Sequence, residues 1–225
     1  AVLLSCAMSA SAAENNLEAS EQQASSIEDR IGKVVSSGKV NLNTRLRYEN
    51  ADSTTPGRKP ANAVTFRTRL GYTTDSWNGL KGMVEFENIT ALGGDNNYRN
   101  APGPGANVFN REVVADPEGT EVNQIWVGYE KWDTNVKFGR QRFTLDNHRF
   151  IGNVVWRQNE QTYDSVTLVN NSIEDLTATY AYLFGVNRIF GDDFGNAAGP
   201  ADGDWESDSH VFHLSYDNVP YGNLT

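Results

Sequence analysis

Strict alternation of apolar and polar residues marks the chain from residue 39 onward. Leu42, Thr44, Leu46 and Tyr48 alternate with polar residues, and residues 64–73 repeat the pattern. A period of two places successive side chains on opposite faces and is typical of a β-strand with one apolar and one polar face. The pattern predicts strands near 39–50, 63–74, 80–91, 121–131, 135–144, 162–169, 175–186 and 209–217.

The connections between these segments alternate in length. Short segments rich in turn residues fall at 75–79, 132–134, 170–172 and 218–222, whereas long polar segments fall at 51–62, 92–120, 145–161 and 187–208. Bacterial outer-membrane barrels have short periplasmic turns and long external loops. A soluble β-sandwich, the alternative, gives no reason for such sorting. We therefore predict an all-β fold, a transmembrane antiparallel up-and-down β-barrel whose apolar face meets lipid. The chain would supply about eight to nine strands of a larger barrel.

The N-terminal residues differ in composition from the rest. Residues 1–13 are apolar and end in small residues suited to cleavage, which predicts a signal peptide remnant and therefore export. Cys6, the one cysteine, is interpreted as a chance residue of that signal, and a lipoprotein acylation site is the alternative.

Residues 14–38 predict a periplasmic segment with a short helix. Ser25 and Glu28 fit a capping box, and the apolar residues that follow share one helical face. The helix is expected either to be a mobile lead-in or to plug the pore. Residues 39–225 then form the N-terminal part of the barrel, which we expect to be truncated.

The polar faces of the predicted strands carry charged side chains. We expect Arg45, Arg47, Arg67, Arg69, Lys81, Glu85, Glu87, Glu130 and Lys137 to line a pore. Charges that point into a wet lumen attract ions and shape the field that a solute meets. Cross-strand pairing of arginine with glutamate would alternatively brace the wall, and both roles can hold together.

The segment 145–161 is too rich in apolar and aromatic residues for a simple solvated loop. We predict that it folds inward as a constriction loop and presents Arg149, Trp156 and Arg157 to solutes. The alternative is a surface loop that packs its own apolar groups on the rim.

Charge and motifs narrow the function classes. The formal net charge of −10 argues against a nucleic-acid partner, which requires a basic footprint. The acidic stretch 192–208 lacks the spacing of a defined calcium loop, so a solvated loop is favoured over a Ca²⁺ site. Neither a catalytic triad nor a phosphate-binding loop is evident, so we predict no enzyme activity, metal or cofactor.

Four blocks resemble one known family: 114–124, 139–142, 146–152 and 156–164. Together they resemble the alginate-export family of Gram-negative outer-membrane barrels, particularly its porin-like members, over roughly residues 38–220. The resemblance implies a single-chain barrel of about eighteen strands in the outer membrane, surrounded by lipid and lipopolysaccharide. It also implies passive passage of an anionic polysaccharide (polyuronate) or of small solutes through an arginine-lined pore.

We therefore predict an outer-membrane channel, or porin, for small or polymeric anionic solutes. The alternative is a structural or adhesive barrel that acts through its long outer loops. An outer-membrane hydrolase is a third hypothesis, and it would need titratable groups that meet near the rim.

Overall fold

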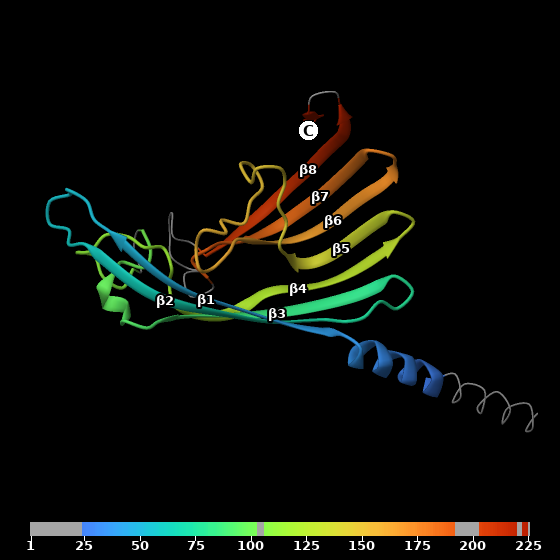
Figure 1. The fold of residues 1–225 in the computed structure, drawn as a ribbon, viewed down its shortest axis with the longest axis horizontal. Helices are drawn as coiled ribbons and strands as arrows, with labels where there is room; N and C mark the ends of the chain where they lie inside the picture. Colours follow the sequence, from blue (N-terminus) through green and yellow to red (C-terminus); the bar gives the residue numbers. More distant parts are fainter. Residues whose placement is uncertain (1–23, 103–105, 192–202, 220–221, 225) are drawn as a thin grey trace, which may run out of the picture.

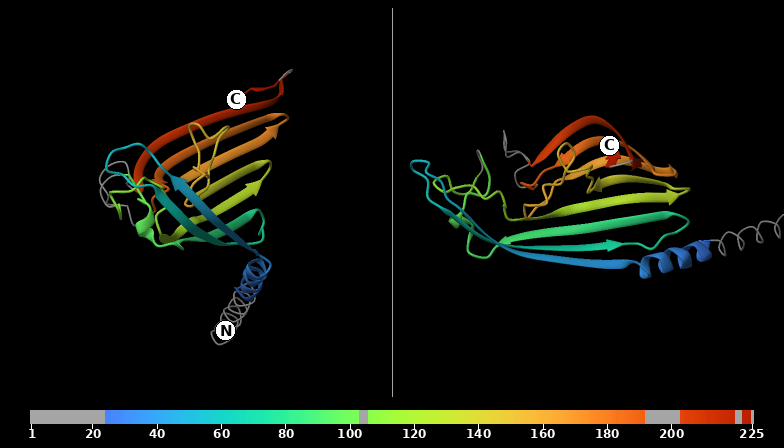
Figure 2. Two further views of the ribbon diagram at one scale, coloured as in Figure 1. Left: turned by 60° about the vertical axis from the view of Figure 1, so that its left-hand side comes forward. Right: turned by 45° about the horizontal axis from the view of Figure 1, so that its top comes forward.

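The computed structural model describes residues 24–102, 106–191, 203–219 and 222–224, so the predicted signal remnant lies outside the described residues. Its strands form one antiparallel sheet in which each strand pairs with the next along the chain (Figure 1). The strands are β1 (Lys39–Ala51), β2 (Ala61–Thr73), β3 (Leu80–Ala91), β4 (Gly119–Lys131), β5 (Thr134–Gln141), β6 (Thr162–Ile173), β7 (Leu176–Asn187), β8 (Asp204–Val219) and β9 (Gly222–Leu224). The sheet is strongly curved but not closed, and β1 and β9 form its two edges (Figure 2).

The predicted up-and-down arrangement is confirmed, with local corrections. Strand β5 ends at Gln141 rather than near 144. Residues 170–172 belong to β6 rather than to a turn, because the tight turn forms at Glu174–Asp175, where Asp175 has a positive φ of 61°. Strand β8 begins at Asp204 rather than near 209, because Asp204 pairs with Asn187 at the end of β7. Asp204, Glu206 and Asp208 therefore belong to a strand and not to the acidic loop, whose residues 192–202 lie outside the described residues.

The N-terminal helix is confirmed over residues 24–36. It extends away from the end of the sheet that carries the short turns (Figure 2), and this part of the helix does not enter the concave face. The hydroxyl of Tyr72 donates a hydrogen bond to the carbonyl of Val35, and the amide of Asp75 donates to Val34 at 3.2 Å. These bonds fix the helix to the β2–β3 turn. Within the described ranges, no helix is long and apolar enough to cross a membrane.

The two faces of the sheet have opposite character, as the alternation predicts. Val40, Leu42 and Leu46 on the outer face of β1 are between 64% and 71% exposed, and Phe138 and Phe212 on later strands are similarly exposed. The concave face instead buries polar side chains of β2, β3, β4 and β6. Apolar side chains that point outward and polar ones that point inward are the reverse of a soluble β-domain and match a membrane barrel.

The long loop 92–118, which contains the 3₁₀ helix η1 (Asp95–Asn97), folds onto the sheet at the end opposite the short turns. Tyr98 and Val114 are buried against Ala61 and Ala63 of β2, and the Tyr98 hydroxyl donates to the carbonyl of Asp116 at 2.9 Å. A short parallel bridge joins Lys59 to Arg111. The loop is therefore a packed layer at the mouth of the sheet.

A β-bulge shapes the concave face between β3 and β4. Glu85 pairs with Gln124 and Phe86 pairs with Val122, which leaves Asn123 as the extra residue. An extra residue in one strand re-aims the side chains beside it. Asn123 and Gln124 consequently both donate to Glu85 Oε1, at 2.8 and 2.9 Å, although they are neighbours in sequence.

Gly139 in β5 has a φ of +125°, and a Cβ atom there would overlap the backbone carbonyl of Ile125. We expect Gly139→Ala to lower the free energy of unfolding by at least about 1–3 kcal/mol, because both the backbone conformation and the space exclude a side chain. Urea unfolding of the full-length protein in detergent measures the loss. The control is Gly32→Ala, a helical site with no atom within 4 Å of the added carbon. Equal unfolding midpoints for the two variants would contradict the expectation.

Candidate functional site

Four arginines from β1 and β2 share the concave face. Arg45 lies directly opposite Arg67 in the register, and Arg47 and Arg69 lie one step along each strand. Like charges that face each other across strands are destabilising. The arrangement therefore requires acceptors from elsewhere in the chain.

Some of those acceptors come from neighbouring strands, such as Asn43 of β1 for Arg67 and Glu87 of β3 for Arg69. Many of the others come from the segment between β5 and β6, residues 142–161, which we call the constriction loop. It crosses the concave face and brings its backbone carbonyls to β1. Arg45 donates to the carbonyl of Val155 at 3.1 Å and to Gln158 Oε1 at 2.8 Å, and it also reaches the carbonyls of residues 156 and 157. The segment predicted at 145–161 therefore lies against the concave face of β1 and β2. That it narrows a pore stays a prediction.

Gln158 anchors the loop to the wall. Its side chain is 0% exposed, and its amide nitrogen donates to Thr65 Oγ1 at 2.8 Å. Its backbone carbonyl accepts from Arg67 at 3.2 Å, and its backbone amide donates to Asp116 Oδ1 at 2.8 Å. One residue thus joins the constriction loop to β2 and to the outer loop 92–118.

Glu160 forms the second anchor. Its carboxylate accepts from Arg142 Nε at 2.7 Å, from Asn123 at 2.8 Å and from Asn153 at 2.9 Å, and it pairs with Arg69 at 3.0 Å. Burial alone would raise the pKa of Glu160. The hydrogen bond from Arg142 and the charge of Arg69 outweigh it, so the pKa lies below the ordinary value.

Asp116 is the acidic partner of the first anchor. It is fully buried, lies 3.5 Å from Arg47 and accepts the Gln158 amide. Burial raises its pKa above the ordinary value, while the Gln158 hydrogen bond and Arg47 oppose that rise. The carboxylate is held next to the arginines at a desolvation cost, as expected for a structural pair.

The constriction loop carries an exposed aromatic residue. The Trp156 side chain is 68% exposed, and the Arg47 guanidinium stacks on its ring at 4.6 Å from the centroid. Arg157 pairs with Glu49 at 3.3 Å. Arg149 is exposed and stacks on the ring of Phe150. It does not belong to the four arginines of the concave face, which we call the arginine ladder: Arg45, Arg47, Arg67 and Arg69.

The other predicted pore-lining residues divide into two groups. Glu87 pairs with Arg69, and Glu85 accepts from the bulge amides, so both belong to the buried network under the constriction loop. Lys81 and Glu130 form a pair at 3.1 Å nearer the short turns, and Lys137 stacks on Trp126 at 4.8 Å. These last three lie outside the constriction.

Sequence reasoning did not single out several residues on which the constriction depends. All of them fall inside the blocks that resemble the family, but no spacing rule links them to one another: Asp116, Arg142, Gln158 and Glu160. The sequence did contain one signal: three polar residues, 158–160, stand directly before the predicted strand at 162–169. In the structure the Glu160 side chain is buried.

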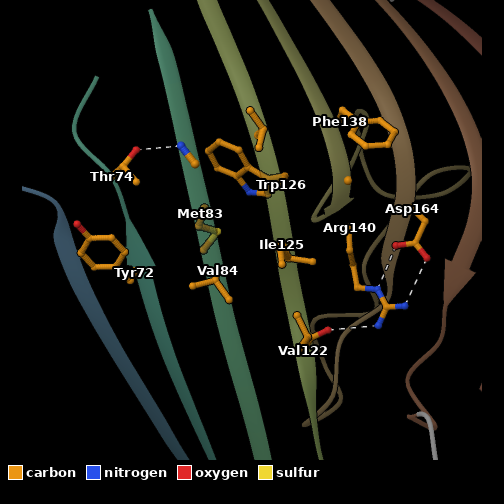
Figure 3. A pocket seen from close by; sticks show the side chains of 13 residues that line it. Tyr72, Thr74, Met83, Val84, Val122, Ile125, Trp126, Phe138, Arg140 and Asp164 are labelled. Atoms are coloured by element: carbon orange, nitrogen blue, oxygen red, sulfur yellow. Dashed lines mark hydrogen bonds and ion pairs between the residues drawn. The ribbon is translucent and has the colours of Figure 1, made fainter. Parts of the chain in front are cut away.

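The outer face carries a separate depression between β2 and β5 (Figure 3). Tyr72, Val84, Ile125 and Phe138 line it, and an ion pair between Arg140 and Asp164 at 3.0 Å lies at its edge. Its lining is mainly apolar and lies on the lipid-facing side. It therefore takes no part in the constriction.

Comparison with known proteins identifies one family and several solved structures with a similar fold. A family model described as "Alginate export" matches residues 36–181. No curated protein matches the chain.

The solved structures that resemble the chain are outer-membrane porins. Acinetobacter baumannii OccAB1 is 14% identical with a TM-score of 0.60, over 83% of this chain and 42% of that one. Pseudomonas aeruginosa OccK9 (OpdG) is 13% identical with a TM-score of 0.59, over 82% and 47%. Pseudomonas aeruginosa OpdK, solved with vanillate, is 12% identical with a TM-score of 0.56, over 83% and 47%. The chain thus spans less than half the length of each, and the likeness concerns the fold.

Proposed function

The chain belongs to the alginate export family, a family of the Gram-negative outer membrane, and we propose that it forms the wall and constriction of a passive channel for small anionic solutes. The observation that carries the proposal is the constriction loop, which crosses the concave face and is fixed to β1 and β2 through Arg45, Gln158 and Arg67. A loop held inside a barrel narrows the path without closing it, which is how size selection arises in a diffusion channel.

The preference for anions rests on the charge that remains after pairing. Basic side chains outnumber acidic ones among the predicted pore-lining and constriction residues. Arg149 and the ring of Trp156 lie at the exposed surface of the loop, and the guanidinium of Arg47, which is largely buried, stacks on that ring. A positive field in a narrow lumen raises the local concentration of anions. Glu87 is paired with Arg69, and Glu85 lies 3.6 Å from Arg142, so these pairs contribute little net charge of either sign.

Two comparisons support a carboxylate as the solute class. The family description names alginate, a polyuronate, and OpdK was solved with vanillate, a small carboxylate. A small carboxylate suits this chain better than a polymer, because the constriction loop is tied to the wall by buried side chains. The exposed apolar band of β1, β5 and β8 would contact outer-membrane lipid and lipopolysaccharide.

Planar-bilayer recordings of the full-length protein test the proposal. We expect stepwise conductance and, in a salt gradient, a reversal potential of the sign that indicates preferred passage of anions. A small carboxylate such as vanillate should carry current or block chloride current. Absence of conductance would contradict the channel, and a cation-preferring reversal potential would contradict the anionic solute class.

A further inference from the structure

The first half of the constriction loop packs on a different wall from the second half. Phe143 and Ile151 of the loop pack against a buried apolar cluster on β6 and β7, and Val211 of β8 packs against the same cluster: Tyr163, Ala181 and Leu183. The Tyr163 hydroxyl also donates to the carbonyl of Gly152 at 2.8 Å. Strands β6, β7 and β8 stand on the other side of the curved sheet from β1 and β2 (Figure 1). The loop is therefore attached to two walls.

One polar contact joins this first half to β8. The Nε2 atom of His213 donates a hydrogen bond to Asp146 Oδ1 at 2.9 Å. His213 lies on the concave face, because Val211 two residues earlier packs against the buried cluster and Phe212 between them is 79% exposed on the other face. The His213 side chain is 17% exposed and that of Asp146 is 42% exposed. The contact thus joins the wall to the loop on the concave side of the sheet.

A closed turn holds Asp146 in place. Its φ is +47°, a left-handed conformation that aspartate tolerates better than most residues. The amide of His148 donates to the carbonyl of Leu145 at 2.9 Å, and the amide of Leu145 donates to the carbonyl of Ile151 at 3.0 Å. The carboxylate that meets His213 therefore belongs to a hydrogen-bonded turn and not to an open stretch of loop.

Asp146 is the charged partner of His213. Within the described ranges it is the one carboxylate that pairs with the imidazole, and the Nδ1 atom of the ring is buried without a hydrogen-bond partner. The strand positions around His213 on the concave face are uncharged, because Thr179 of β7 lies opposite it and Val211 and Ser215 lie two residues away on β8. The interaction of the ring with the loop therefore depends on Asp146.

The other charged or titratable groups of the surrounding elements lie farther from His213 along the chain or in the sheet order. Asp217 follows it by four residues on β8, and Lys137 belongs to β5, three strands away. The loop adds His148 and Arg149 beside Asp146. Strand β9 pairs with β8 only at residues 216 and 219, so its described part does not reach His213 in the register.

The strength of the contact depends on the charge of the imidazole. A histidine side chain ordinarily changes charge between about pH 5 and 8. A protonated ring and a carboxylate form a hydrogen bond between two full charges, which is stronger than the bond from a neutral ring. The first half of the loop should therefore be held more firmly at low pH than at high pH.

We propose that His213 is a positioning residue of the constriction: through Asp146 it fastens the first half of the loop to β8, while the arginine ladder fastens the second half to β1 and β2. This inference rests on the proposed channel function and adds a second, pH-dependent attachment to it. The apolar packing of Phe143 and Ile151 remains when the ring is neutral. A weakened contact therefore lets the loop fluctuate but does not release it.

The variance of the open-channel current, recorded from the full-length protein in planar bilayers, tests the pH dependence. We expect the wild-type variance to be at least about twofold higher at pH 8 than at pH 5.5, because the neutral ring holds the loop less firmly. His213→Gln keeps a donor that cannot be protonated, and Asp146→Asn removes the carboxylate. In both variants the ratio of the two variances should fall to about one.

The controls remove the other two histidines of the chain, His148 and His210. His148 is an exposed residue of the loop with a φ of +63°, which asparagine tolerates. His210 stacks on the rings of Tyr180 and Tyr182. We expect His148→Asn and His210→Gln to keep the wild-type ratio of variances.

Hydrogen exchange of the full-length protein in detergent follows the loop without reference to conductance. At pH 5.5 we expect residues 143–152 to exchange at least about threefold faster in His213→Gln and Asp146→Asn than in the wild type. Residues 155–160 should keep the wild-type rate, because the arginine ladder holds that half.

Equal exchange of residues 143–152 in the wild type and in both variants would overturn the proposal, whether or not the channel conducts. A wild-type ratio of variances that persists in His213→Gln would overturn it as well, because the pH dependence would then arise elsewhere. Absence of conductance in every variant would contradict the channel proposal alone, and the exchange rates would then decide the role of His213.

Discussion

Replacing both Arg45 and Arg47 with alanine should raise the single-channel conductance of the full-length protein several-fold. The two side chains donate to the backbone carbonyls of residues 155–157 and to Gln158, so their loss detaches the middle of the constriction loop from β1. A loop freed from the wall no longer narrows the lumen. Anion preference should fall at the same time, because two positive charges leave the narrowest part of the path.

The matched control removes the same charge without touching the loop. Lys81→Ala with Lys137→Ala deletes two cations that pair with Glu130 and stack on Trp126. We expect this double variant to shift the reversal potential but to leave the conductance close to that of the wild type. Equal conductance changes in the two double variants would mean that charge alone, and not attachment of the loop, sets the conductance.

Glu160→Gln should be the most destabilising single change at the site. The carboxylate is 2% exposed and holds Arg69 and Arg142 together with the amides of Asn123 and Asn153. Removing one partner of a buried charge network costs about 3–5 kcal/mol, because the remaining charge stays desolvated without compensation. Urea unfolding of the full-length protein in detergent measures the change in the free energy of unfolding.

Glu130→Gln is the control. Glu130 pairs with Lys81, and its side chain is 57% exposed. An exposed pair contributes about 0–1 kcal/mol. Midpoints that fall equally in both variants would contradict a special role for Glu160. The pKa of Glu160 is lowered in the folded protein, so its stabilisation is complete above the ordinary value of 4.5. It should be lost as the pH falls through the lowered pKa.

The strand pattern was predictable because it rests on local rules. Alternation of Leu42, Leu46 and Tyr48 with Arg45 and Arg47 specifies a strand and its two faces without knowledge of any partner strand. The lengths of the connections then gave the direction of the apolar face. Errors arose where a strand continues past the apolar band, as β8 does from Asp204, because polar strand residues there look like a loop.

The pairing inside the site was less predictable. Arg45 meets Gln158 across 113 residues, and Gln158 meets Asp116 across 42, so no spacing rule connects them. Whether an arginine meets solutes or braces the wall also could not be decided from the sequence, because both roles place the same residues on the same face of the sheet. The buried state of Arg67 and Arg69 indicates that these two mainly brace.

The extra residue Asn123 required knowledge of the register. Period-two counting assigns Asn123 and Gln124 to opposite faces, yet the bulge turns both toward Glu85. Without that irregularity Asn123 would point to lipid, and Glu160 would lose one of its donors. The alternation of β4 thus fails at Asn123, the residue that donates to Glu160 of the constriction loop.

The arginine ladder holds the loop largely by main-chain oxygens, which every amino acid possesses. Side chains at 155–157 can therefore change during evolution while the hydrogen bonds from Arg45 to their backbone carbonyls remain. A lineage could retune which nutrient or polymer passes by altering the exposed tip, Trp156 above all, while the mechanical attachment stays as it is. Attachment of the loop and preference for a solute can therefore change independently in evolution.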